Sequence, residues 1–101
     1  MNIKILESAI EDLKEGYLFY ENQESGVGDY FLDSLFSDID SLKLFPGSHS
    51  IHFDKYHRLL SKRFPFAVYY RIAEEEIRVY AVLDCRRDPA WTRKKLENDF
   101  E

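Results

Sequence analysis

Apolar side chains recur every three to four residues through the first part of the chain. The two series are Ile10, Leu13, Tyr17 and Tyr20, followed by Phe31, Leu35, Ile39 and Leu42. This spacing gathers the apolar side chains on one face of a helix and leaves the intervening polar residues on the other. Residues 25–28 contain two glycines and interrupt the pattern, and residues 45–47 end it with a proline and a glycine. The sequence therefore predicts an antiparallel helical hairpin.

Ser8 and Glu11 predict where the first helix begins. In a capping box, a serine hydroxyl accepts a hydrogen bond from a free amide of the first turn. A glutamate three residues later reaches back to the amide of the serine. Because Ser8-Ala9-Ile10-Glu11 has this spacing, we expect Ser8 to cap the helix.

After residue 47 the apolar period changes from near four to two, which is typical of strands. The expected strands cover residues 50–53, 58–63, 66–72 and 77–83, and an opening strand covers residues 2–6. The alternation assigns one face to Phe66, Val68, Tyr70 and Ile72 and, in the last strand, one face to Ile77, Val79, Ala81 and Leu83. A polar turn at residues 73–76 joins these two strands, which we therefore expect to be antiparallel.

The order of elements indicates the fold class. Two helices with one apolar face each need the face of a sheet to cover. We therefore predict an α+β fold of two layers, a helical hairpin packed on a small, mainly antiparallel sheet. No repeat, linker or break in composition divides the chain, so residues 1–101 are expected to form one domain. The charged tail at residues 86–101 is predicted to be a loop followed by a short helix at residues 93–96.

Charge is distributed unevenly along the 101 residues. Residues 1–54 hold three basic and eleven acidic residues, a net charge of −8, whereas residues 55–101 hold eleven basic and eight acidic residues, a net charge of +3. The second half is therefore expected to carry any surface for an anionic partner. The total of −5 argues against a general nucleic-acid-binding protein, because such domains are usually basic.

The sequence also predicts the compartment. The longest apolar runs have the length of strands and are too short to cross a membrane, and Lys4 and Glu7 come too early for a signal peptide. Cys85 is the sole cysteine, so no intramolecular disulfide can form, as is usual in a reducing compartment. We expect a cytoplasmic protein with no membrane partner.

The end of the last predicted strand carries the strongest candidate binding site. It comprises Arg86, Arg87 and Trp91, extended by Arg58, Lys62 and Arg63 on a neighbouring strand. Guanidinium groups pair bidentately with phosphate or carboxylate and stack on aromatic rings, so this surface suits an anionic or a protein partner. Alternatively, Arg86 and Arg87 pair with Asp84 and Asp88 and simply cap the sheet edge.

Other chemistry is weakly represented. His49, His52 and His57 flank Asp54 without a cysteine pair or a helical His-Glu motif, so we expect solvated or strand-facing histidines and no metal. Cys85 lies beside two arginines but is followed by no phosphate-binding loop, so we expect an ordinary thiol. The glycines between the helices do not follow a strand and therefore form no dinucleotide-binding motif. No cofactor is predicted.

The order and spacing of several segments resemble the RelE/ParE superfamily of toxins from bacterial type II toxin–antitoxin modules. The resemblance is closest to the ParE-like, plasmid-stabilisation branch and extends from Ile3 to about Trp91. It rests on Ala9, Asp12, Leu13 and residues 19–23, on residues 26–28 with Phe31 and Leu35, on Phe45-Pro46, on Arg58 and residues 64–71, and on Val82-Leu83 with residues 86–91.

The resemblance implies a growth-inhibiting toxin that is neutralised by a small antitoxin encoded beside it. RelE-like members cleave mRNA on the ribosome, whereas ParE-like members poison DNA gyrase without a known catalytic reaction. This chain has Ala67 where RelE-like enzymes place an arginine, and Trp91 and Arg93 where their closing segment carries a tyrosine. Arg87 matches the remaining RelE-like arginine. Fewer basic groups would stabilise less of the charge in a cleavage transition state.

Our leading hypothesis is therefore a ParE-like toxin that inhibits DNA gyrase by protein binding and meets its cognate antitoxin in the resting cell. The alternative is a ribosome-dependent mRNA endoribonuclease that uses Arg87 with Lys62 or Arg71. A third hypothesis is an inactive binding module that retains the fold.

Overall fold

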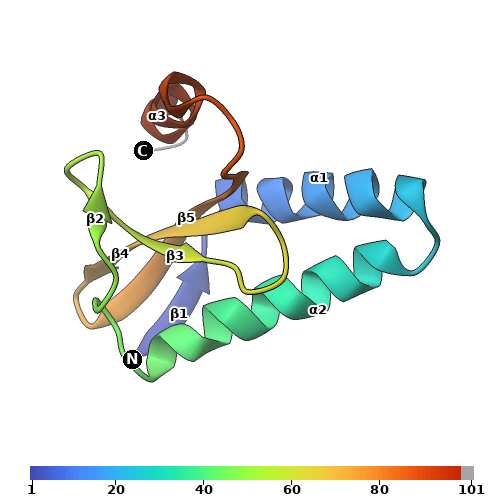
Figure 1. Ribbon diagram of the computed structural model, residues 1–101. Helices are drawn as coiled ribbons and strands as arrows, with labels where there is room; N and C mark the ends of the chain where they lie inside the picture. Colours follow the sequence, from blue (N-terminus) through green and yellow to red (C-terminus); the bar gives the residue numbers. More distant parts are fainter. Residues whose placement is uncertain (99–101) are drawn as a thin grey trace.

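The two predicted amphipathic helices form a hairpin against one face of a five-stranded sheet, as the computed structural model shows (Figure 1). The structure describes residues 1–98. In chain order the elements are β1 (Asn2–Ile5), α1 (Glu7–Gln23), α2 (Val27–Asp40), a 3-10 turn η1 (Ser41–Lys43), β2 (Ile51–His52), β3 (Tyr56–Leu60), β4 (Phe66–Ala73), β5 (Glu76–Asp84) and α3 (Pro89–Asn98).

The strands are ordered β1-β5-β4-β3-β2 across the sheet. β1 pairs with β5 in parallel, and the other three pairs of neighbours are antiparallel. The sheet is therefore mixed but mainly antiparallel, and the predicted α+β fold with a helical hairpin on the sheet is confirmed.

Buried side chains form one cluster on each face of the sheet. Between the hairpin and the sheet lie Ala9, Leu13, Phe31, Leu35, Ile39, Leu42, Phe66, Val68, Tyr70, Ile77, Val79 and Val82. The opposite face carries Tyr56, Ala67, Tyr69, Ala81, Leu83 and Leu96. Leu96 comes from α3, so this helix covers part of the sheet face that the hairpin leaves open, an addition to the predicted two layers.

An extra residue in β5 overturns one predicted alternation. The sequence assigned one face to Ile77, Val79, Ala81 and Leu83. In the structure Tyr70 lies opposite Val79 and Tyr69 lies opposite Ala81, so Tyr80 forms a bulge. Residues before the bulge and residues after it therefore alternate in opposite phase. Val79 faces the hairpin, whereas Ala81 faces α3.

The predicted capping box at Ser8 was wrong. Helix α1 begins at Glu7, and Leu6 precedes it without a side-chain cap. The Ser8 hydroxyl donates instead to the backbone carbonyl of Tyr80, at an O–O distance of 2.6 Å. Because β1 ends at Ile5, the edge of β5 has no strand beside it at the bulge. Ser8 provides the hydrogen bond that a longer β1 would have made.

Two further boundaries differ from the prediction. β3 ends at Leu60, so Lys62 and Arg63 lie in the turn before β4 rather than on a strand. The C-terminal helix was predicted at residues 93–96 and is longer, starting at Pro89. Residues 99–101 of the predicted charged tail lie outside the described residues.

Gly26 and Glu21 build the turn between the two helices. Gly26 has a φ of +95°, a left-handed conformation that glycine adopts without steric cost. The carboxylate of Glu21 accepts hydrogen bonds from the amides of Gly26 and Gly28, at 3.1 and 2.9 Å. A carboxylate at the N-terminus of α2 also interacts favourably with the helix dipole.

Gly16 is the contact point at which α1 approaches α2, and we expect Gly16→Ala to destabilise the fold by about 1 kcal/mol. A Cβ atom at this position would lie 2.4 Å from Cζ of Phe31, which is fully buried. Overpacking of this kind costs about 1–3 kcal/mol, and the better helix propensity of alanine returns about 1 kcal/mol. Urea unfolding measures the difference. Glu15→Ala, at an exposed neighbour, is the control, and equal stability of the two variants would contradict the prediction.

Candidate functional site

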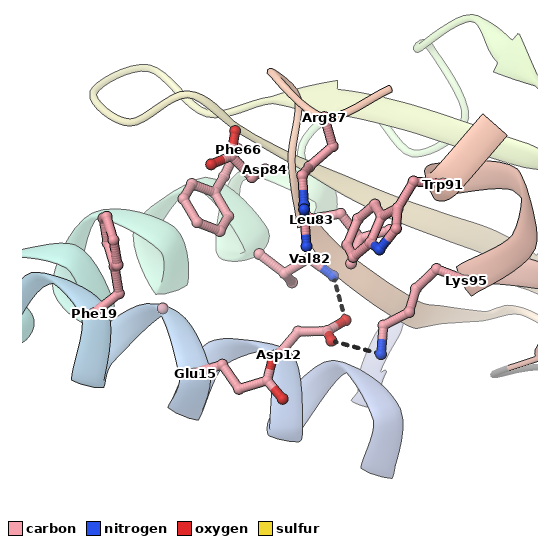
Figure 2. A pocket seen from close by; sticks show the side chains of 11 residues that line it. Asp12, Glu15, Phe19, Phe66, Val82, Leu83, Asp84, Arg87, Trp91 and Lys95 are labelled. Carbon is pink, nitrogen blue, oxygen red and sulfur yellow. Dashed lines mark hydrogen bonds and ion pairs between the residues drawn. The ribbon is translucent and has the colours of Figure 1, made fainter. Parts of the chain in front are cut away.

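Three of the predicted binding residues, Arg86, Arg87 and Trp91, lie where β5 passes into α3. β5 ends at Asp84 and α3 begins at Pro89, so Arg86 and Arg87 occupy the short turn between them. Figure 2 shows Arg87 and Trp91 side by side above α1. The site is thus built from the end of a central strand, the turn after it and two helices.

Asp12 of α1 lies at the bottom of this site, below Arg87 and Trp91 (Figure 2). Its side chain is buried, with the residue only 5% exposed. Oδ2 accepts a hydrogen bond from the backbone amide of Val82 at 3.0 Å, and Oδ1 lies 3.8 Å from Nζ of Lys95 on α3 (Figure 2). Asp12 therefore accepts a hydrogen bond from an amide of β5 that lies beyond the end of β1. Its ion pair with Lys95 also connects α1 to α3.

Arg86 is committed to Asp84. Its guanidinium donates through Nε to Oδ1 at 3.0 Å and through Nη2 to Oδ2 at 2.7 Å, a bidentate pair. Hydrogen bonds from Arg86 hold the pKa of the Asp84 carboxyl below its usual value. Arg86 also lies within hydrogen-bonding reach of Tyr20 on α1, whose pKa is raised mainly by burial. For Arg86, the structure therefore matches the alternative in which the arginine pairs with Asp84.

Arg87 stacks on Trp91. Its Cζ atom lies 4.0 Å from the centroid of the indole ring, the geometry of a cation–π contact. The alternative prediction paired Arg87 with Asp88. The Asp88 Oδ1 atom instead accepts a hydrogen bond from the amide of Ala90 at the start of α3, at 3.0 Å. Arg87 is exposed, so its guanidinium is accessible to solvent while it contacts the indole ring.

A cleft of about 370 Å³ lies between α1 and α3, below Arg87. Its lining includes Asp12, Glu15, Phe19, Asp84, Arg87, Trp91 and Lys95. We call it the α1–α3 cleft. Phe19 is 51% exposed at its rim, so an arginine, a tryptophan and a phenylalanine are available on one small surface. Aromatic residues and arginine are the typical anchors of protein interfaces.

A second cleft of about 70 Å³, the Arg58 cleft, lies on the other side of Arg87. Arg58, Arg87, Tyr69 and the exposed Cys85 line it. Burial raises the pKa of Tyr69, and a hydrogen bond from Arg58 lowers it in part. The phenol is therefore neutral near pH 7 and can donate a hydrogen bond to an anion, but it is not poised to act as a base.

The remaining predicted residues do not converge on Arg87. Lys62 and Arg63 are exposed in the turn after β3. Arg71 pairs in register with Arg78, six residues before the end of β5. At about 3.3 Å per residue, Arg71 lies about 20 Å along the sheet from the row at which Arg87 emerges.

Sequence reasoning missed Asp12, Phe19 and Lys95 as parts of the site. A signal for Asp12 was present, because it shares the helical spacing of Ala9 and Gly16, which are buried on α1. An acidic residue on the buried face of a helix needs a partner. No comparable signal marks Phe19, since an exposed aromatic side chain on a helix has many explanations.

The three histidines serve the loop before β3. Nδ1 of His49 lies 2.6 Å from the hydroxyl of Tyr70, and His57 stacks on the Tyr70 ring with its Nδ1 2.7 Å from the His49 carbonyl. His52 instead contacts the Ser50 hydroxyl at 3.1 Å. Within residues 1–98, no three His, Cys, Asp or Glu side chains gather in a group that could hold a metal ion.

His49 is expected to make stability depend on pH. Burial, and then the charge of His57, lower the pKa of His49 below 6.5. As pH falls below about 6.5 the unfolded chain binds a proton that the folded chain resists, so stability is full above that pH and decreases below it. His49→Gln should weaken this dependence in urea unfolding between pH 5 and 8. His52 shifts in the same direction, so His52→Gln is measured in parallel. Identical pH profiles for wild type and His49→Gln would contradict the assignment.

The hairpin carries an apolar groove on its outer side, which we call the hairpin groove. Its volume is about 560 Å³, and it is lined by Ile10, Leu13, Lys14, Tyr17, Leu18, Asp29, Leu32 and Phe36. Leu18 is 56% and Phe36 is 45% exposed. An exposed apolar groove of this kind typically marks a surface for another protein.

None of the helices within residues 1–98 is long and apolar enough to cross a membrane.

Comparison with known proteins identifies the family. Among models of protein families, "ParE toxin of type II toxin-antitoxin system, parDE" matches residues 3–89. A solved chain titled "Chromosomal ParDE TA system from P. aeruginosa" has a TM-score of 0.75 and 17% identity, covering 81% of this chain and 92% of that chain. At this identity the similarity establishes the fold alone. No curated protein matches the chain. Because the family match includes the hairpin, the sheet and the Arg86-Arg87 turn, the chain belongs to the ParE toxin family of type II toxin–antitoxin systems.

Proposed function

We propose that this chain arrests growth by binding DNA gyrase and is held inactive by a cognate antitoxin. The proposal starts from the family, whose ParE-like members act on gyrase. The observation that carries it is the anchor surface at the α1–α3 cleft, where Arg87 stacks on Trp91 beside the exposed Phe19. Rigid arginine and aromatic side chains around a cleft suit the binding of a protein surface.

The distribution of basic groups favours binding over catalysis. Phosphodiester cleavage would need several basic groups around one phosphate. Arg86 is neutralised by Asp84, and Arg71 emerges about 20 Å from Arg87 along the sheet. Ala67, which takes the place of a RelE-like arginine, is fully buried. Arg58 and Lys95 each line a cleft with Arg87, but these are two different clefts. Few cationic groups within residues 1–98 would therefore surround any one phosphate.

The hairpin groove is a surface that suits the antitoxin. Leu18 and Phe36 expose apolar area there, which a resting toxin would keep covered by a partner. Residues 7–40, which form α1, α2 and the turn between them, hold ten acidic residues and one lysine. A partner that covers the hairpin should therefore be amphipathic and basic.

Tightly controlled expression of the chain alone tests the proposal. DNA supercoiling, the DNA damage response and mRNA integrity are followed together, and purified chain is added to gyrase in a supercoiling assay. Growth arrest with gyrase-type DNA damage, intact mRNA and inhibited supercoiling is the expected result. Arrest with unaffected gyrase, or no arrest, would overturn it.

The Arg58 cleft supports ribosome-dependent mRNA cleavage as a second candidate function. Arg58 and Arg87 line this cleft with the neutral phenol of Tyr69, and two guanidinium groups could hold a phosphate there. This candidate predicts codon-positioned cuts in mRNA after induction. The cuts should disappear in Arg58→Ala, whereas gyrase inhibition should not depend on Arg58.

A further inference from the structure

We propose that Cys85 is a modification site. A small acidic disulfide, such as oxidised glutathione, forms a mixed disulfide with it and places one carboxylate in the Arg58 cleft. The reaction does not depend on the target of the chain. Three features of the structure support it: an exposed thiol that lines the cleft, the cationic groups of the cleft and two buried hydroxyl groups in its lining.

The thiol of Cys85 is exposed at a fixed point of the fold. Cys85 follows the last residue of β5, and its amide donates a hydrogen bond to the carbonyl of Pro65 at 2.9 Å. This bond anchors the backbone of Cys85 to the residue before β4. Thiol–disulfide exchange needs a thiol that the reagent can reach. Cys85 meets that condition and also lines the Arg58 cleft.

The Arg58 cleft is cationic. Arg58 and Arg87 line it, and no acidic residue of the described chain does. Within residues 1–98, neither of these guanidinium groups forms an ion pair, in contrast to Arg86, which is bound to Asp84. Two guanidinium groups without a carboxylate partner attract an anion and can hold a carboxylate through charge-assisted hydrogen bonds.

Two buried hydroxyl groups of this cleft can still donate a hydrogen bond. Thr92 is 5% and Tyr69 is 3% exposed, and both residues line the cleft. Among the described residues the Thr92 hydroxyl has no hydrogen-bond partner, and the Tyr69 phenol accepts from Arg58 but donates to none. Buried polar groups are nearly always hydrogen-bonded. A carboxylate that enters the cleft would provide the acceptor that both hydroxyl groups lack.

The size of the cleft decides which part of the reagent enters it. The cleft has a volume of about 70 Å³, whereas drug-sized ligands occupy pockets of about 300–1,000 Å³. Only a small group such as a carboxylate fits. The rest of the disulfide would lie in solvent beside the exposed thiol, where its sulfur atoms can meet Sγ of Cys85.

The reaction is a thiol–disulfide exchange. The Cys85 thiolate attacks one sulfur of the disulfide, a bond forms between that sulfur and Sγ, and the original S–S bond breaks. The other half leaves as a thiolate and takes up the proton that Cys85 lost. Cys85 is thereby oxidised and the released half is reduced, so the disulfide itself is the only oxidant needed. An excess of small thiol reverses the modification.

The rate of adduct formation tests the site. Reduced chain is mixed with oxidised glutathione or with the neutral bis(hydroxyethyl) disulfide, and intact mass measures the adduct on Cys85, the sole cysteine. The ratio of the two rates is compared between the folded chain and the chain unfolded in urea, which cancels the intrinsic reactivity of each reagent. This ratio should be at least about tenfold higher in the folded chain, because only the fold assembles the cationic cleft.

Three substitutions connect this preference with the cleft. Arg58→Ala removes a guanidinium group and should lower the ratio at least about fivefold, whereas Thr92→Val removes only a hydroxyl and should lower it about threefold. Lys94→Ala removes an exposed cation of α3 that does not line the cleft, so the ratio should not change. Each folded variant should react with the neutral disulfide at the wild-type rate. If Arg58→Ala does not fold, Thr92→Val decides.

Equal ratios in the folded and the unfolded chain would overturn the proposed site. A ratio that Lys94→Ala lowers as much as Arg58→Ala would also overturn it, because the general charge of the surface would then explain the preference. Absence of an adduct with either disulfide would show that the thiol cannot be reached, with the same consequence.

The adduct should also weaken the binding surface around Trp91, a consequence that rests on the proposed function. Arg87 lines both the α1–α3 cleft and the Arg58 cleft, so a carboxylate in the second cleft competes with the partner for its guanidinium. The modified chain should bind purified gyrase at least about tenfold more weakly than the reduced chain, and dithiothreitol should restore binding. Equal binding of both forms would overturn this consequence alone. A reduced chain that does not bind gyrase would overturn the proposed function and leave the adduct kinetics unaffected.

Discussion

Asp12→Ala is expected to lower the free energy of unfolding by about 3 kcal/mol. The substitution leaves the amide of Val82 without an acceptor and Nζ of Lys95 without the carboxylate that lies 3.8 Å away. A buried donor that loses its partner costs about 1–3 kcal/mol, and removing one member of a buried ion pair costs about 3–5 kcal/mol. Because Lys95 is one-third exposed and can turn to water, the expected loss lies at the low end.

Urea unfolding of three variants checks this value. Asp12→Asn keeps an oxygen that can accept the Val82 amide but removes the charge, so it should cost less than Asp12→Ala. Glu11→Ala, in the preceding residue, removes an exposed carboxylate that contacts Lys14 at 3.5 Å and should change stability by less than about 0.5 kcal/mol. Asp12→Ala that is as stable as Glu11→Ala would contradict the role assigned to Asp12.

The same substitution should also loosen α3. Apart from the Lys95 contact to Asp12, Leu96 buries the helix against the sheet, and Trp91 and Thr92 lie at its first turns. Loss of the carboxylate would therefore remove one of the contacts that hold this helix, besides those of Leu96 and of Arg93 with the Phe53 ring. Because α3 carries both Lys95 and Trp91, the candidate binding surface and the fold would share part of their stabilisation.

The fold could be predicted because the apolar residues of its main helices and strands recur at the spacing typical of each element. The series from Ile10 to Tyr20 and from Phe31 to Leu42 follows the helical repeat, and residues 66–72 alternate without interruption. The bulge at Tyr80 could not be predicted, because it depends on pairing with Tyr69 and Tyr70 across the sheet. The failed capping box has the same cause, since the partner of Ser8 is a carbonyl 72 residues away.

The candidate site was predictable only as a region. The sequence places Arg86 and Arg87 together at a strand end, but the two side chains meet different partners, Asp84 and Trp91. The direction of a side chain that follows the end of a strand depends on the turn and on the packing of α3. Neither of these produces a local pattern in the sequence. Arg71 illustrates the same limit, because an alternating pattern gives its face but not its distance along the sheet from Arg87.

Arg87→Ala and Trp91→Ala are each expected to weaken binding of purified gyrase about 30-fold, or about 2 kcal/mol, which is the usual cost of removing an interface anchor. Arg87 presents its charge from the face of the indole ring, 4.0 Å from the ring centroid. The two side chains therefore act as one unit, and the double variant should lose less than the sum of the single losses. Binding isotherms with gyrase measure all three values.

Arg86→Ala is the matched control, since this neighbouring arginine is equally cationic but bound to Asp84. If exposed positive charge alone attracted the target, Arg86→Ala and Arg87→Ala would weaken binding similarly. If Arg87 must be supported by the indole ring, Arg87→Ala and Trp91→Ala relieve growth arrest and Arg86→Ala does not. Trp91→Phe then arrests growth more strongly than Trp91→Ala, because a phenyl ring retains a weaker cation–π contact. Circular dichroism confirms that each variant is folded before its binding is compared. Arrest that persists in the double variant would remove the Arg87–Trp91 surface from the mechanism and redirect attention to Phe19 at the rim of the same cleft.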